Sequence, residues 1–251
     1  MNKLIVRADD LGISEAVNCG ILKAIRDGVV TSTGLMTNMP FAQQGFNMVK
    51  ETQVCLGMHG NISTGRPASN LSEIPSLVRE DGNFYSSKEI AQKNHVLNEN
   101  ECEIELEAQL HRFREITGTD PHYFEGHAVF SKVWFEAQQI FAERNHLFLD
   151  LPGFDPSWEE RTGIGSLSWT KPDEHGLYDP KKMMNNSLDN LKEHEACIGV
   201  FHPGYIDQYL LDNSSYTMIR VMECDFLCSK WLRDFLSTNK IELRTYDNYA
   251  Q

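Results

Sequence analysis

The sequence predicts a deformed (β/α) barrel with about seven parallel strands, and two observations lead to this fold class. Short apolar, β-branched runs alternate with amphipathic segments along the chain, and repeated βα units form parallel sheets. About seven such units fit within 251 residues, which favours a barrel over an open sheet. We find neither a composition break nor an internal repeat, so we expect a single domain over residues 1–251.

The first half of the chain is expected to supply four strands. They are the apolar runs at residues 4–8, 29–39, 54–62 and 122–130. Amphipathic periodicity predicts helices at 14–28, 41–52 and 87–118, the last as one helix or as two that break near residues 98–100. Ser14 is a candidate N-cap, and Gly28 closes the first helix. Residues 63–85 are rich in Gly, Pro, Ser and Asn and predict a long loop, a type that is often functional.

The second half continues the alternation. Helices are predicted at residues 132–146, 180–195 and 216–239. Strands are predicted at residues 147–151, 196–205 and 241–246. Between them, residues 152–172 form a Gly- and Pro-rich stretch without a predicted element.

Composition and charge exclude several classes of protein. The chain is 41% hydrophobic and 24% charged, as is usual for globular proteins. Its net charge of −13 disfavours binding to nucleic acid or to an anionic membrane. Asp9 and Asp10 end the first apolar run early, so we predict no signal peptide. The sequence contains no run of 18 apolar residues, so we predict no membrane-spanning helix. We expect a cytoplasmic protein, with a homodimer as the default for an enzyme of this size.

The six cysteines include no CxxC pair. Cys19, Cys55 and Cys197 lie in apolar, periodic segments. We therefore expect reduced cysteines that mostly pack in the core.

Polar side chains follow four of the predicted strands. They are Asp9, Asp10, His59, Glu125, His127 and His202. The carboxyl ends of the strands of a parallel barrel meet at one mouth, so we expect these side chains to lie together. Taken singly, each has a simpler explanation: Asp10 as a helix cap, His202 as a turn residue before a proline, and a strand-end histidine as a structural residue. Their joint placement favours a site.

One carboxylate and two imidazoles form a three-ligand metal site with open positions, the pattern of a catalytic metal site. A metal would neutralise one of the adjacent aspartates and lower the pKa of a bound water. The other aspartate would then take the proton of that water. His202, across the mouth, would donate a proton to the leaving group. Arg66 and Tyr205 are further candidates for contact with the substrate or for support of the site.

Three segments carry a resemblance to a known family. The opening "IVRADDLGISEAVNCGILKAIRDGVVTSTGLMTN", the segment "LGMHGNIS" and the segment "FHPGYID" resemble, in this order, the YdjC-like carbohydrate deacetylases, the family of chitooligosaccharide deacetylase. The resemblance covers most of the chain, and the opening motif is specific.

The resemblance implies a deformed barrel related to polysaccharide deacetylases, one divalent metal ion (magnesium or zinc), and hydrolysis of an N-acetyl group on a sugar. Carried over to this sequence, Asp10, His59 and His127 would be metal ligands and Asp9 the base, although the roles of the two aspartates could be reversed. His202 would be the acid, or would stabilise the tetrahedral oxyanion.

This sequence departs from the family around the fourth strand. The family pattern there is a histidine-rich stretch that also holds an aspartate, whereas this chain has "HYFEGHAVF". Glu125 stands where the family has the aspartate, and Tyr123, Ala128 and Phe130 replace histidines. Glu125 can still support a ligating histidine. The metal site should therefore carry over better than the identity of the sugar.

The expected function is removal of an N-acetyl group from an amino sugar or short chitooligosaccharide. Two alternatives stay open: a related metal hydrolase that cuts another amide or an ester, and a catalytically silent sugar-binding protein on the same barrel. Retention of Asp9, Asp10, His59, His127 and His202 together argues against the silent protein.

Overall fold

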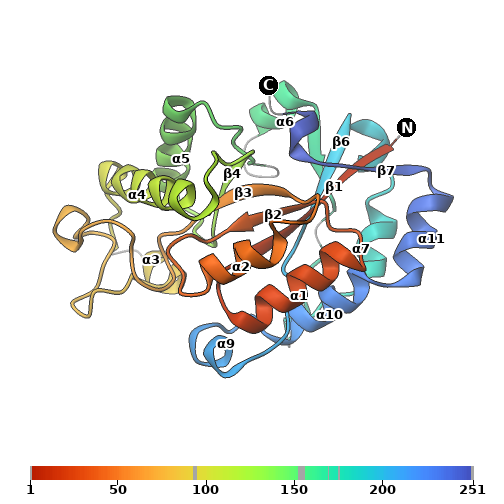
Figure 1. Ribbon diagram of the computed structural model, residues 1–251. Coiled ribbons are helices and arrows are strands. Elements are labelled where there is room, and N and C mark those ends of the chain that lie inside the picture. The colour runs from red at the N-terminus through yellow and green to blue at the C-terminus, as the bar shows by residue number, and fades with distance from the viewer. Residues whose placement is uncertain (1, 93–94, 152–155, 169, 175, 250–251) are drawn as a thin grey trace.

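A computed structural model describes residues 2–92, 95–151, 156–168, 170–174 and 176–249. Within these residues, seven parallel strands form one curved sheet in the order β4-β3-β2-β1-β6-β5, with β7 also paired to β1 (Figure 1). The strands are β1 (Asn2–Leu11), β2 (Ser32–Leu35), β3 (Cys55–Gly60), β4 (Phe124–Gly126), β5 (Ile164–Ser166), β6 (Ala196–Phe201) and β7 (Ile241–Arg244). No pairing between β4 and β5 closes the described sheet, so the predicted deformed barrel is confirmed as a half-barrel.

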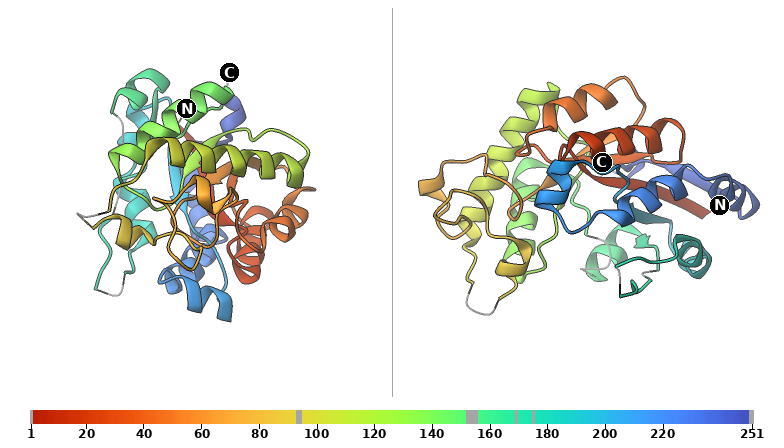
Figure 2. Two further views of the ribbon diagram at one scale, coloured as in Figure 1. Left: turned by 90° about the vertical axis from the view of Figure 1, so that its left-hand side faces the viewer. Right: turned by 90° about the horizontal axis from the view of Figure 1, so that it is seen from below.

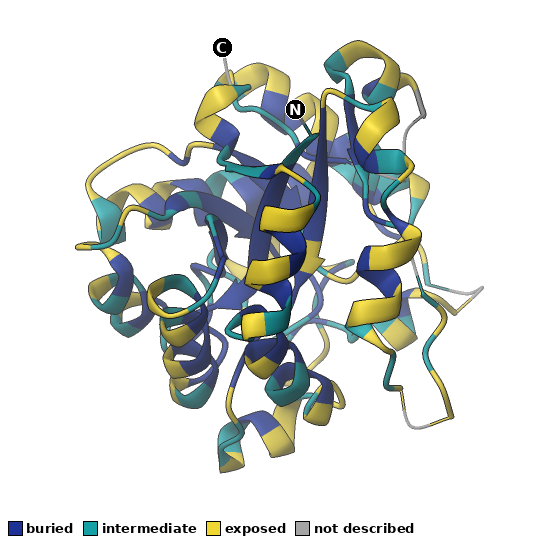
Figure 3. Ribbon diagram, turned by 90° about the vertical axis from the view of Figure 1, so that its right-hand side faces the viewer, coloured by how far each residue is buried: buried dark blue, intermediate teal, exposed yellow. Residues whose placement is uncertain are grey.

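Helices surround the sheet. They are α1 (Glu15–Arg26), α2 (Ala42–Val49), α3 (Ser87–Ile90), α4 (Glu99–Thr117), α5 (Lys132–Asn145), α6 (Pro156–Thr162), α7 (Pro180–Asn186), α8 (Asn190–Glu193), α9 (Gln208–Asn213), α10 (Met218–Leu227) and α11 (Lys230–Thr238). The longer ones contact one another in the order α5, α4, α2, α1, α10, α11 around the outside of the strands (Figure 2). The strands between them are almost wholly buried, whereas the helices expose their outer faces (Figure 3). None of the described helices has the length and apolar character needed to cross a membrane.

The strand β1 lies at the centre of the sheet and divides its two faces. Leu4, Val6 and Ala8 pack into the large core beneath the helices. Ile5 faces the other way, into an inner cluster. The members of the inner cluster are Ile5, Cys55, Tyr123, Leu151, Trp158, Ile164, Ile198 and Tyr246. Because side chains alternate along a strand, Arg7 and Asp9 follow Ile5 up the inner face.

Local capping explains where several helices begin. The hydroxyl of Ser14 accepts a hydrogen bond from the Val17 N–H, as predicted for the start of α1. The predicted helix at 216–239 is instead two helices, because the Ser229 hydroxyl accepts from the Leu232 N–H and starts α11 anew. The helix predicted at 180–195 likewise divides into α7 and α8. Of the two alternatives predicted for residues 87–118, the structure has two helices, α3 and α4, and the Asn98 side chain caps the start of α4.

Two strand predictions need correction. The run at 147–151 makes one isolated parallel bridge, between Leu149 and Phe124, and forms no strand of its own. The sheet instead gains β5 from within the Gly- and Pro-rich stretch. Three residues suffice there because Ile164 and Gly165 pair with the start of β6, and Ile164 fills the inner cluster.

Candidate active site

Three donor atoms converge at the carboxyl ends of β1, β3 and β4. Nε2 of His59 lies 3.1 Å from Oδ1 of Asp10 and 3.0 Å from Nδ1 of His127. Nδ1 of His127 is also 3.1 Å from the same oxygen of Asp10. Asp10 and His59 are buried, whereas the His127 side chain keeps 14% of its surface exposed and leaves the group open on one side.

Asp10 reaches this position through a local change in the backbone. Adjacent residues of a regular strand point to opposite faces, so Asp9 and Asp10 would ordinarily diverge. Asp10 adopts a left-handed φ of 72°, and the pairing of β1 with β2 shifts register between Ala8 and Leu11. Such irregularities redirect side chains. Both carboxylates therefore lie at the same mouth of the half-barrel.

Glu125 fixes the orientation of His59. The two residues are direct partners in the pairing of β3 with β4. Oε1 of Glu125 is hydrogen-bonded to Nδ1 of His59. With Nδ1 engaged by Glu125, Nε2 is directed at Asp10 and His127. Nε2 is therefore the ring atom that would bind a metal once its proton is displaced. Gly34 makes room for the pair, because a Cβ there would lie 2.5 Å from Oε1 of Glu125.

A buried guanidinium holds Asp10. Nη2 of Arg220, on α10, donates to Oδ2 of Asp10 over 2.6 Å, and Nε of Arg220 donates to the Tyr216 carbonyl. Burial would raise the pKa of Asp10, but Arg220 and the imidazole of His127 outweigh it and hold the pKa well below its usual range. Asp10 is therefore a carboxylate with one oxygen fixed by Arg220 and the other presented to the imidazoles.

A second guanidinium holds Asp9. Nε of Arg7 donates to Oδ1 of Asp9 over 2.6 Å, and Nη2 donates to Oδ2 over 3.0 Å. Burial acts to raise the pKa of Asp9, but Arg7 together with His59 and His202 lowers it below its usual value. Nε2 of His202 lies 4.0 Å from Oδ2 of Asp9, and its side chain is 28% exposed.

Arg7 is itself held by residues from two distant segments of the chain. Its Nη1 donates to Asp150, which also accepts from the Tyr246 hydroxyl. Its Nη2 lies 3.6 Å from Oε2 of Glu125. One buried arginine thus joins Asp9 to the carboxylate that orients His59.

His202 is fixed from behind. Its backbone N–H donates to Glu223 of α10, and Glu223 also accepts from the Tyr178 hydroxyl over 2.6 Å. The ring of Tyr216 packs edge-on against the His202 ring, with centroids 5.1 Å apart. The imidazole is thereby held at the mouth beside Asp9.

The three donor atoms fit a divalent cation. Bonds of about 2.1 Å at right angles place neighbouring ligand atoms about 3.0 Å apart, which matches the observed separations. The surroundings also favour positive charge. Burial lowers the pKa of His59, yet Glu125 and Asp10 outweigh burial and raise it to about 10. Asp9, His59 and Glu125 also lie close enough to form a metal group, but Arg7 already occupies both oxygens of Asp9.

Comparison with known proteins decides the family. A family model described as YdjC-like protein matches residues 3–238. The chain belongs to the YdjC-like family. Carbohydrate deacetylase 2 of Listeria innocua is 32% identical over 256 residues, which cover 97% of each protein. Chitooligosaccharide deacetylase of Klebsiella pneumoniae is 28% identical over 250 residues, again 97% of each. The resemblance inferred from the sequence is therefore confirmed.

A solved structure shares the fold. A protein described as a cellobiose-phosphate cleavage protein, from Enterococcus faecalis, superposes with a TM-score of 0.86 and 24% identity, and both chains are fully covered. This likeness supports the half-barrel as the fold of this YdjC-like chain.

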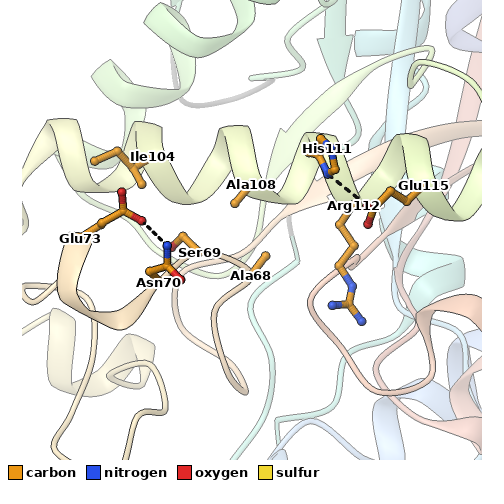
Figure 4. Close-up of a pocket in the computed structure, with 9 residues that line it drawn as sticks. All are labelled: Ala68, Ser69, Asn70, Glu73, Ile104, Ala108, His111, Arg112 and Glu115. Carbon is orange, nitrogen blue, oxygen red and sulfur yellow. Dashed lines mark hydrogen bonds and ion pairs between the residues drawn. The ribbon is translucent and has the colours of Figure 1, made fainter.

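Two candidate side chains of the YdjC-like chain lie against other partners. Arg66 is exposed in the loop after β3, where its guanidinium lies near Asp81. The Tyr205 hydroxyl lies near Cys224 of α10. Their proposed contact with substrate stays a prediction. A surface cavity of about 350 Å³ lies between the 68–73 loop and α4 (Figure 4), and none of its lining residues belongs to the site at the strand ends.

Sequence reasoning missed the residues that support this YdjC-like site. They are Arg7, Asp150, Glu223, Arg220 and Tyr246. Arg7 and Asp150 left a signal, since each is a charged residue inside or at the end of an apolar run. Arg220 left none, because it lies in an ordinary amphipathic helix 210 residues from its partner Asp10.

Proposed function

We propose that this protein is a metal-dependent deacetylase that removes the N-acetyl group from an amino sugar or a short chitooligosaccharide. The observation that carries the proposal is the convergence of Asp10, His59 and His127 beside a second carboxylate, Asp9, which Arg7 clamps. Membership of the YdjC-like family and relatives named for carbohydrate deacetylation support the substrate class.

In this proposal Asp10, His59 and His127 hold one divalent cation. When bound, such a cation supplies Lewis acidity, which polarises the acyl oxygen and lowers the pKa of a water. Two imidazoles in the donor set favour zinc or another transition ion over magnesium. Arg220 and Glu125 keep the ligands oriented before any substrate arrives.

Asp9 is the proposed general base. Its lowered pKa keeps it ionised at neutral pH, so it can accept a proton from water on a carboxylate lone pair that Arg7 does not use. Arg7 holds the carboxylate in one orientation and offsets its charge. Hydrolysis then breaks the C–N bond of the acetamide and releases acetate and the free amine. His202 is the proposed acid, donating from Nε2 to the departing nitrogen.

The first experiment measures acetate release after the metal is stripped with chelator and single metals are resupplied. The panel contains N,N′-diacetylchitobiose, N-acetylglucosamine and its 6-phosphate. Release restored by magnesium, zinc, manganese or cobalt supports the proposal, and the most active compound identifies the substrate. Absence of release from every sugar, with metal bound at the Asp10 group, would contradict it.

One observation favours a second candidate, a metal hydrolase that acts on another amide or on an ester. Phe130, three residues after His127, is 72% exposed. An apolar rim suits a less polar acyl substrate. O-acetylated sugars and simple acetate esters therefore belong in the same panel, and activity confined to them would support this candidate.

A further inference from the structure

We propose a second metal site where β3 and β4 begin, formed by Cys55, His122 and Asp247. It is suited to Zn²⁺ or a similar thiophilic divalent cation. The donor atoms of these three side chains lie within 4.8 Å of one another. Thiolate, imidazole and carboxylate are the three ligand types that zinc takes in proteins, and a water would complete four-coordination.

Three separate elements bring the side chains together. Cys55 is the first residue of β3. His122 lies just before β4, and its backbone N–H donates to the Leu56 carbonyl over 3.0 Å, which ties it to β3. Asp247 lies in the short 3₁₀ turn η2 (Tyr246–Asn248), after β7. At about 3.3 Å per residue, Cys55 is about 13 Å along β3 from His59, so this site is distinct from the one proposed for catalysis.

The ligands are open to solvent on one side. Asp247 and His122 are hydrogen-bonded to each other, and their side chains are 49% and 50% exposed. Both can therefore rotate to admit a cation while the backbone of β3 stays in place. Cys55 is buried and forms the inner wall.

The surroundings of the sulfur favour a thiolate once a cation is present. Backbone N–H groups of Tyr246 and Asp247 hydrogen-bond to the sulfur. Ser32 is the register partner of Cys55, and its buried hydroxyl lies within reach of the sulfur. A thiolate would be a stronger acceptor for that hydroxyl than the thiol is.

Burial, and then the Asp247 carboxylate, raise the pKa of the Cys55 thiol to about 12, so the sulfur is protonated when no cation is present. A bound cation would have to displace this proton, because the metal binds the thiolate. Binding would then fasten the turn η2 to β3.

The test uses cobalt as a spectroscopic probe on the full-length protein. The Asp10 group holds no cysteine, so a thiolate-to-cobalt charge-transfer band reports the second site alone. We expect two cobalt ions per chain and one such band in the wild type. Cys55→Ser should abolish the band and leave one cobalt ion bound.

Two variants serve as controls. Cys19→Ser removes an exposed thiol on α1 and should keep the band. His127→Gln disables the Asp10 group and should also keep the band, which separates this inference from the proposed function. A cobalt-saturated wild type without the band, or a band that persists in Cys55→Ser, would overturn the proposal.

Cys55 is buried, so its variant could fail to fold. His122→Gln and Asp247→Asn change half-exposed side chains and avoid this problem. Each removes or weakens one ligand and should lower the affinity for cobalt at the thiolate site about tenfold or more. An unchanged cobalt affinity in His122→Gln would by itself contradict the assignment.

Discussion

The two ends of the sheet each gather carboxylate and imidazole groups, but they stabilise them differently. At the carboxyl end, Asp9 and Asp10 are buried and each contacts a buried arginine. At the amino end, Asp247 is half exposed and hydrogen-bonded to His122. A buried carboxylate needs a charged or hydrogen-bonding partner, and a charged partner such as arginine fixes its orientation. The carboxyl end is therefore preorganised, whereas the amino end can adjust to a ligand.

The largest expected effect concerns the proposed base. Asp9→Asn removes the proton acceptor and should lower kcat about 10²- to 10⁴-fold, with metal still bound. Acetate release and metal content check this result. Asp234→Asn, an exposed aspartate paired with Lys230 on α11, is the matched control and should leave kcat unchanged. Loss of metal in Asp9→Asn would instead make Asp9 a ligand.

The second prediction tests whether arginine pairing sets the carboxyl end apart. Arg7→Met leaves Asp9 and Asp150 buried without their guanidinium and should lower the free energy of unfolding by about 3–5 kcal/mol. Arg114→Met breaks an exposed pair with Asp120 and should cost less than about 1 kcal/mol. Urea denaturation measures both. Equal stability of the two variants would remove the contrast between the ends.

The third prediction concerns the pH dependence of stability. Burial raises the pKa of Asp150 to about 6. Arg7 and Tyr246 act to lower this pKa, whereas Glu125 and Asp9 add to the increase. The folded state thus binds this proton more tightly than the unfolded chain, whose pKa is near 3.9. Stabilisation from this proton is complete below about pH 4 and is lost as the pH rises through 6.

Asp150→Asn isolates this titration. The free energy of unfolding of the wild type minus that of Asp150→Asn should fall by up to about 3 kcal/mol between pH 4 and pH 7, from about two units at 1.36 kcal/mol each. Denaturation curves across this range provide the measurement. A difference that rises with pH would show that Arg7 lowers the pKa of Asp150 more than burial raises it.

The smallest expected effect sharpens the comparison of the two metal groups. Glu125→Gln weakens the acceptor that orients His59 and should lower metal affinity at the Asp10 group about tenfold. The cobalt–thiolate band of the amino-end site should stay unchanged in the same variant. Competition with a chelating dye gives the affinity. A parallel loss at both sites would show that the two ends are coupled.

The sequence was sufficient to predict the alternation of strands and helices and the side chains at the strand ends. Asp10, His59 and His127 could be identified because each directly follows or ends an apolar run, and parallel strands bring such positions together. Residues 147–151 are also an apolar run with a charged residue, Asp150, near the end. The same reasoning from strand ends would have placed Asp150 with the side chains at the mouth.

The remaining features depend on tertiary contacts. The strand β5 is three residues long and owes its conformation to pairing with β6, so its sequence carries no periodic signal. The break between α10 and α11 falls inside a continuous apolar pattern and depends on the cap at Ser229. The pairing of Arg220 with Asp10 is set by how α10 packs, which no local pattern encodes.

The pairing of β1 has a consequence for the nascent chain. One edge of β1 pairs with β7 over residues 2–5 and with β2 over residues 7–11, and its other edge pairs with β6. During synthesis both edges of β1 can therefore be fully paired only after β7 has been made. The hydrogen bond from Arg7 to the Tyr246 hydroxyl likewise forms only after residue 246 has been made. Contacts of such long sequence separation form slowly, so a ribosome-bound chain would expose an unfinished sheet, a natural target for a chaperone until translation passes β7.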